Sequence, residues 1–381
     1  MLRIAGIFMN DYALCFSSSS DSGEAFAANL EQIRKKADGR APLLVIFFSG
    51  LKNFEFYSRK FHDTFPCSTV LGATSSIEFC SCGTGEHSLS SVAFFSGMEV
   101  SSGILHNIRR FPMHDVNNVR AAFDSLDDTR NTICLEFTAA FANTEELVLD
   151  TFSSVLRGTG IPVCGSTAGA EPGCTDTLVS LDGEISDDAC VFVFIRNLCG
   201  KIFLYRENIY RPTSCSFLVT DVDCDERIVY ELDHRPAAAA LSGNLNIPVE
   251  KLAEFLSSHP FGRMNGRGIY VTDVADVLPD GGIALYSGIY NYSKLVLLEL
   301  GDTAAIWKRT TADVHAAIPK PSFSFVVNCL NRTKAALSTG RFDEFAEVLR
   351  TEFGNYIGIS GYGEQADFVN FNRAMLLAVF E

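Results

Sequence analysis

One short segment of the chain carries residue types that could do chemistry, PVCGSTAGAE at positions 162–171. It holds the pattern G-x-T-x-G, with Thr167 between Gly165 and Gly169. On a sharp turn such a hydroxyl can act as a nucleophile, as serine does in G-x-S-x-G enzymes. The glycines could instead let backbone N–H groups surround an anion. A third interpretation is that the turn only shapes the backbone.

The elements around this turn can be predicted from periodicity. A strand is predicted at 132–137 and another at 189–195, with a helix at 143–160 between the first strand and the turn. Apolar residues recur at helical spacing in that helix, and Gly158 stands where a helix-ending glycine belongs. Asn143 and Glu146 have the spacing of a capping box, which predicts that the helix begins just after Asn143.

The same order of strand, helix, strand, turn and strand occurs three times. The copies, called repeats 1 to 3, cover residues 43–97, 132–195 and 323–380. Their turns lie at 72–75, 165–169 and 360–364. A turn that recurs at the same place is first a structural device, since glycine permits positive φ or close backbone approach. This recurrence disfavours a nucleophile, which is needed once and needs a base beside it.

Composition excludes several classes of function. With 47% hydrophobic and 20% charged residues the 381-residue chain is globular, and its net charge of −15 argues against binding nucleic acid or an anionic membrane. No apolar run reaches the roughly 18–20 residues needed to span a bilayer. The start of the chain resembles a first strand more than a signal peptide, so a cytoplasmic location is expected.

The twelve cysteines are scattered singly through apolar runs, which is typical of buried free thiols. The one close pair, Cys80 and Cys82, lacks a second pair or a histidine at zinc spacing. A metal site is therefore not expected. No P-loop pattern occurs in the chain.

Taken in order, the motifs of the chain resemble those of the FIST domain family, with both N-terminal and C-terminal FIST regions. The matching segments are LVIFFSG (44–50), LGATSS (71–76), PVCGSTAGA (162–170), ELDHRPAAAAL (231–241), HPFGR (259–263), NCLNR (328–332), GYGEQ (361–365) and FNRA (371–374). The resemblance implies a cytoplasmic sensory domain rather than an enzyme. It implies a small ligand, such as an amino acid or a related molecule, and signalling to a chemoreceptor, kinase or cyclase output domain, as in chemotaxis. Some relatives are haem-binding gas sensors, so haem stays an alternative to having no cofactor. A homodimer also stays open.

A zwitterionic ligand would need a cation and an anion in one pocket. Arg332 follows the strand at 323–330, and Glu364 follows the turn of the next strand. Ends of neighbouring strands meet at one sheet edge, where α/β proteins tend to bind ligands. Arg332 could bind a carboxylate and Glu364 an ammonium group, with Tyr362 as an aromatic wall and Asn372 as a polar contact. The alternative is that Arg332 and Glu364 pair with each other as structural support.

Further polar residues could line such a pocket. Thr74, Ser75, Ser166 and Thr167 supply hydroxyl groups at the first two turns, or they serve only as turn formers. Arg267 lies with His259 and Arg263 in the most basic loop of the chain, which could receive an anion or simply face solvent.

We predict a mixed α/β fold whose sheets are built from the repeats, in two regions. Residues 1–205 form the first region and residues 206–381 the second, which adds helices around 236–241 and 249–258, a hairpin at 281–300 and a helix at 302–318. Two other functions stay open. One is a hydrolase or transferase using Thr167 or Cys164, and the other is a haem gas sensor using one of the seven histidines.

Overall fold

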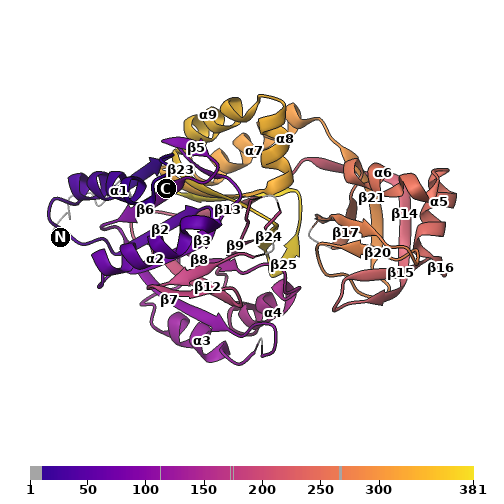
Figure 1. Cartoon of the computed structure of the whole chain (residues 1–381), viewed down its shortest axis with the longest axis horizontal. Helices are drawn as coiled ribbons and strands as arrows, with labels where there is room; N and C mark the ends of the chain where they lie inside the picture. Colours follow the sequence, from indigo (N-terminus) through magenta and orange to yellow (C-terminus); the bar gives the residue numbers. More distant parts are fainter. Residues whose placement is uncertain (1–10, 112, 172, 175, 266–267) are drawn as a thin grey trace. The chain divides into compact units, whose positions relative to one another are not determined.

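The structure is a computed structural model that describes residues 11–111, 113–171, 173–174, 176–265 and 268–381. It confirms a mixed α/β fold built from three repeats (Figure 1). The described chain forms two compact units. Unit 1 holds the residues up to Arg206 together with 310–369 and 375–381, and unit 2 holds 207–309 and 370–374. The regions 1–205 and 206–381 were predicted as the two family regions along the chain, and these boundaries stay a prediction.

Unit 1 contains three six-stranded sheets of the same design. In each sheet two central strands are parallel, and the flanking strands are antiparallel. Sheet 1 has the order β1 (Tyr12–Ser17), β6 (Leu89–Phe94), β2 (Leu44–Ser49), β3 (Thr69–Thr74), β10 (Val179–Leu181), β11 (Glu184–Ser186). Sheet 2 has the order β7 (Met98–His106), β12 (Ala189–Asn197), β8 (Thr132–Thr138), β9 (Val163–Thr167), β24 (Gly363–Ala366), β25 (Val369–Phe371). Sheet 3 has the order β13 (Ile202–Asn208), β26 (Ala374–Phe380), β22 (Phe323–Cys329), β23 (Asn355–Gly361), β4 (Glu78–Cys80), β5 (Gly83–Gly85).

The repeats exchange hairpins in a closed cycle. The hairpin β10–β11 of repeat 2 pairs with β3 of repeat 1, and β24–β25 of repeat 3 pairs with β9 of repeat 2. The hairpin β4–β5 of repeat 1 completes the cycle on β23 of repeat 3, so segments from opposite ends of the chain lie side by side (Figure 1). Each sheet therefore takes its last two strands from another repeat.

Each sheet carries helices on one face and meets the other sheets with its opposite face. The helices are α1 (Ser22–Ala37) and α2 (Leu51–Thr64) on sheet 1, α3 (Val116–Asp124) and α4 (Glu145–Leu156) on sheet 2, and α8 (Leu330–Ser338) and α9 (Phe342–Phe353) on sheet 3. Phe26 of α1 and Phe61 of α2 pack with Phe47 of β2 between the first pair of helices and sheet 1. On the opposite face, Phe48 of sheet 1 lies edge-on against Phe137 of sheet 2, with 5.3 Å between ring centroids.

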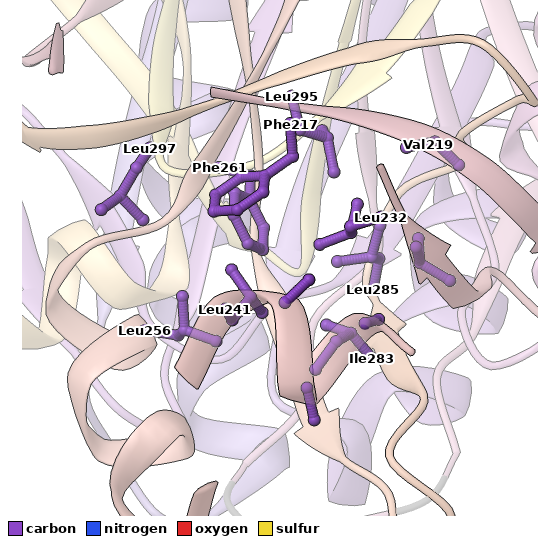
Figure 2. Packing of buried hydrophobic residues seen from close by; sticks show 14 of the residues in the cluster. Phe217, Val219, Leu232, Leu241, Leu256, Phe261, Ile283, Leu285, Leu295 and Leu297 are labelled. Carbon is purple, nitrogen blue, oxygen red and sulfur yellow. The ribbon is translucent and has the colours of Figure 1, made fainter. Parts of the chain in front are cut away.

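Unit 2 is a strongly bent sheet covered by two short helices. The sheet has the order β18 (Gly268–Thr272), β17 (Phe261–Asn265), β21 (Lys294–Leu300), β14 (Tyr210–Asp223), β15 (Ile228–Leu232), β20 (Ile283–Leu285), β19 (Val274–Val277), and β16 (Arg235–Pro236) pairs with β15. Helices α5 (Ala237–Leu245) and α6 (Leu252–Ser258), with a 3₁₀ turn at Val249–Lys251, bring Leu241 and Leu256 to the core. Figure 2 shows this core, in which Phe217, Phe261 and Leu295 meet. Helix α7 (Thr303–Ala317) carries the chain back into unit 1.

Two local predictions were wrong. Asn143 has φ +53°, and Thr144 is the N-cap of α4, so the capping box at Asn143 does not form. Residues 281–300 are no hairpin, because β20 pairs with β15 and β19 whereas β21 pairs with β14 and β17. The two strands β20 and β21 therefore pair with other strands of the sheet and not with each other.

Candidate functional site

The three turns of the repeats meet and bond to one another in a ring. We define them as Thr74–Ser76 (turn 1), Thr167–Gly169 (turn 2) and Ser360–Tyr362 (turn 3). The last residue of each turn donates its backbone N–H to the first residue of another turn. These bonds are Gly169 to Thr74 at 3.0 Å, Tyr362 to Thr167 at 3.1 Å and Ser76 to Ser360 at 3.1 Å. The ring satisfies backbone groups that would otherwise be buried and unpaired.

The turns are equivalent by strand register as well as by sequence. Thr74, Thr167 and Ser360 lie opposite Ser49, Thr138 and Asn328 on the neighbouring parallel strands. Gly169 has no room for a side chain, because an added Cβ would come within 2.4 Å of the Ser360 carbonyl oxygen. This glycine is therefore required by the close approach of turns 2 and 3.

Most hydroxyl groups predicted at the turns bond to the backbone. Thr74 Oγ1 accepts from Leu178 N at 3.1 Å, and Ser75 Oγ donates to Ile77 O at 2.7 Å. Ser166 Oγ donates to Thr167 O at 3.0 Å. These contacts support the interpretation of Thr74, Ser75 and Ser166 as turn formers.

Thr167 differs, because its hydroxyl bonds to two side chains. Thr167 Oγ1 donates to Glu145 Oε1 at 3.2 Å and accepts from Gln365 Nε2 at 2.8 Å. Glu145 is the first residue of α4, and Gln365 belongs to the exchanged strand β24, directly opposite Gly165. All three side chains are buried. The structure thus brings together a carboxylate, a hydroxyl and an amide from three separate segments.

A second buried carboxyl group, Glu136 on β8, lies beside the backbone of Gly165. Glu136 Oε2 accepts from Thr138 Oγ1 at 2.9 Å and from Cys190 Sγ at 3.4 Å, whereas Oε1 has no hydrogen-bond partner among the described residues. A Cβ on Gly165 would lie 1.8 Å from that Oε1. Burial raises the pKa of Glu136 to about 8, so this group is mainly protonated at pH 7.

Two further predicted residues, Glu364 and Tyr362, lie close to Gln365 in the sequence. Glu364 is fully buried in β24 opposite Ser166. Tyr362 donates its hydroxyl to Ala170 O at 3.2 Å, and its ring lies 5.4 Å from that of Phe141. We call Glu145, Thr167 and Gln365 the turn 2 cluster. Glu364 lies next to Gln365 but points to the opposite face of the sheet, because successive residues of a strand alternate between its faces. Its role in ligand binding stays a prediction.

The remaining predicted residues lie elsewhere. Arg332 is half-buried in the first turn of α8. Asn372 belongs to unit 2, where its Oδ1 accepts from Asp273 N at 3.1 Å. Arg267 lies outside the described residues. Their roles in ligand binding stay predictions.

Glu136, Glu145 and Gln365 were not predicted from the sequence. Glu136 was the most visible of the three, since it is an acidic residue inside an otherwise apolar strand, TICLEF. Gln365 lies in the GYGEQ segment next to a predicted residue. No local pattern places Glu145 beside Thr167, because that contact depends on where α4 begins.

The described residues give little support to the two alternative functions, a hydrolase or transferase and a haem gas sensor. Burial raises the pKa of the Cys164 thiol far above its usual range, which disfavours a thiolate nucleophile there. Among the described residues no three His, Cys, Asp or Glu side chains are grouped for a metal ion. A small apolar cavity lies between the three sheets and is lined by Phe48, Phe137, Phe325 and their neighbours. Its lining includes no histidine that could ligate a haem iron.

Fold and site together define a mixed α/β protein of three repeats whose turns form a ring beside a buried polar cluster. Two family models cover most of its length: the FIST N domain matches residues 42–235, and the FIST C domain matches residues 237–367. The chain belongs to the FIST domain family, whose domains are sensory domains of signal transduction. The resemblance seen in the sequence is therefore confirmed.

No curated protein matches the chain in sequence. In the part of the chain that the structure describes, no helix has the length and apolar character needed to cross a membrane.

Proposed function

We propose that this chain is a cytoplasmic sensory domain that binds a small ligand carrying an ammonium group, an amino acid or a related molecule, at the turn 2 cluster. The signal passes to an output domain, such as a chemoreceptor, kinase or cyclase, or to a separate partner. The hydrogen bonds of Thr167 carry this proposal. Its hydroxyl bonds to the side chains of Glu145 and Gln365, whereas the equivalent Thr74 hydroxyl bonds to the backbone.

The chemistry of the cluster suits an ammonium group. Glu145 in this cluster is a carboxylic side chain that is 6% exposed. Burying charged groups is costly unless they are paired and hydrogen-bonded, and an ammonium ligand supplies both a charge and three donors. Arg332 in α8 would bind the carboxylate of the same ligand, because its planar guanidinium donates two parallel hydrogen bonds.

Chain connectivity supplies a route for the signal. Gln365 lies on β24, and the chain continues through β25 directly into residues 370–374 of unit 2. There Asn372 N donates to Val271 O at 2.9 Å, and Arg373 forms an ion pair with Asp273. In this proposal the hairpin β24–β25 has two positions. A ligand that binds one position more tightly than the other shifts the hairpin toward it, and residues 370–374 transmit that shift to unit 2.

A thermal-shift screen of the full chain tests the proposal. The compounds are amino acids, simple amines, small carboxylates, nucleotides and haem. A ligand at a hundredfold excess over its Kd stabilises the protein by about 2.7 kcal/mol, which is readily seen as a higher melting temperature. We expect amino acids or amines to stabilise the wild type, and Glu145→Gln and Arg332→Ala to lose the shift. If only haem or nucleotides act, or if both variants keep the full shift, the proposal is wrong.

A further inference from the structure

A second polar cavity lies in unit 1 at the amino end of α2, separate from the turn 2 cluster. It is lined by Gly50, Lys52, Asn53, Tyr57, His87 and Glu171. The cavity has room for about one water molecule. None of these residues belongs to the predicted ligand site.

Helix α2 presents uncapped N–H groups to this cavity. The helix has 14 residues, its N-cap is Gly50, no side chain caps it, and its first turn holds no acidic residue. A helix start of this kind attracts an anion, because its first N–H groups lack partners and carry the positive end of the dipole.

A carboxylate from repeat 2 already occupies this position. A Cβ built on Gly50 would lie 2.2 Å from Glu171 Oε1, which places that oxygen against the backbone where α2 begins. The same oxygen lies 2.9 Å from His87 Nδ1. The Glu171 side chain is only 13% exposed although it comes from a loop. Glu171 thus lies beside the start of α2 without a hydrogen bond to its N–H groups.

Tyr57 gives the independent sign that the cavity is built for a ligand. This side chain is 1% exposed and lines the cavity, and its hydroxyl has no hydrogen-bond partner in the described chain. A buried hydroxyl without a partner costs free energy, so an acceptor in the cavity would be favoured. Burial raises the pKa of Tyr57, and the nearby Asn53 amide lowers it in part, so the phenol keeps its proton and can donate.

The surroundings favour a single negative charge. Ser88, which also lines the cavity, donates from N and Oγ to Glu78 Oε2 at 2.8 and 2.9 Å. Burial raises the pKa of Glu78 to about 8, with a further rise from the charge of Glu171. A neutral Glu78 tolerates one carboxylate, whereas a doubly charged phosphate would be repelled once Glu78 ionises.

We propose that the amino end of α2 is a binding site for the carboxylate of a small free molecule, and that Glu171 fills this site until the ligand displaces it. The incoming carboxylate would displace the Glu171 side chain from beside Gly50, accept from the free α2 N–H groups and extend into the cavity to accept from Tyr57. Lys52 would provide the positive charge beside it. This site is independent of the turn 2 cluster.

The test uses the full chain and acetate as the probe, with chloride at equal ionic strength. Isothermal titration and thermal shift are measured for the wild type and for Glu171→Ala. We expect Glu171→Ala to bind acetate at least tenfold more tightly than the wild type. Adding Tyr57→Phe to Glu171→Ala should remove most of that gain. Acetate should be preferred to inorganic phosphate at pH 8.5.

Glu184→Ala is the matched control, since it also removes a carboxylate bonded to a histidine, His106, at 2.8 Å. It should leave acetate binding unchanged. If Glu171→Ala does not fold, Glu171→Gln keeps the shape and removes the charge, and it should show a smaller gain of the same sign. The proposal is overturned if neither variant binds acetate more tightly than the wild type, if Glu184→Ala gains as much, or if phosphate binds as well as acetate.

Discussion

Gln365 Nε2 donates a 2.8 Å hydrogen bond to Thr167 Oγ1, a contact that joins residues 198 positions apart. It exists because repeat 3 lends its hairpin to the sheet of repeat 2. The residues around turn 2 therefore come from two repeats, and neither repeat alone holds the complete cluster.

The Thr167 hydroxyl can be tested against its equivalent in repeat 1. Thr167→Val should abolish the ligand-induced thermal shift and should lower the free energy of unfolding by about 1–3 kcal/mol, since Gln365 and Glu145 lose a partner. Thr74→Val removes the acceptor for Leu178 N and should cost a similar amount of stability while keeping the ligand shift. Equal ligand shifts in both variants would show that Thr167 is only a turn former.

Gly165 should be intolerant of any side chain. Gly165→Ala places a Cβ within 1.8 Å of Glu136 Oε1, and we expect a loss of about 1–3 kcal/mol in urea unfolding. Glu136→Ala in the same chain makes room, so the double variant should lose less than the sum of the two single losses. Strict additivity would mean that Glu136 does not press on Gly165.

Much of this fold follows from local patterns. The strands carry apolar runs and the helices carry apolar stripes, so the three repeats and the positions of the turns were predicted and are confirmed. The exchange of hairpins was not predicted, because β24 has the same pattern whether it pairs with its own repeat or with β9. Asn143 shows a related limit, since its capping signal competed with a left-handed backbone that the fold imposes.

The site was predictable only in part. Thr167 and Glu364 were identified from the turns, and the structure places both around turn 2. Gln365 and Glu145 escaped prediction because their contacts depend on tertiary pairing. Arg332 could be placed after a strand from its position in the sequence, but the direction of its side chain could not be predicted. Asn372 was expected as a polar contact of the pocket, whereas its side chain bonds within unit 2.

Stability should depend on pH through Glu136. Its pKa in the folded protein is about 8, above the ordinary value of 4.5, and burial is the main cause. The folded state therefore binds more protons than the unfolded state between about pH 4.5 and 8, and this group makes stability fall as pH rises through that window. Glu136→Gln stays neutral, so it should gain on the order of 1–3 kcal/mol relative to the wild type between pH 5 and pH 9. Urea unfolding at both pH values measures the change, and a constant difference would contradict it.

The segment that enters unit 2 is held by a buried ion pair. Arg373 Nη2 lies 2.7 Å from Asp273 Oδ1, and Nε lies 2.5 Å from Oδ2, with both side chains at most 9% exposed. Arg373→Leu should cost about 3–5 kcal/mol, because Asp273 keeps a buried charge without its partner. Asp273→Leu with Arg373→Leu should recover most of that loss. A double variant as unstable as the single one would show that the pair itself is needed.

The closed cycle of exchanged hairpins also governs the order in which the sheets can fold during synthesis. Sheet 1 lacks its edge until β10 and β11 leave the ribosome, and sheet 2 waits for β24. The hairpin β4–β5, made early, has no partner until β23 emerges more than 270 residues later. Sheet 3 cannot be completed before β26 (Ala374–Phe380) has been made. The sheets of unit 1 therefore wait for strands from all three repeats, and chains that stop before β24 and β26 expose strand edges that favour aggregation.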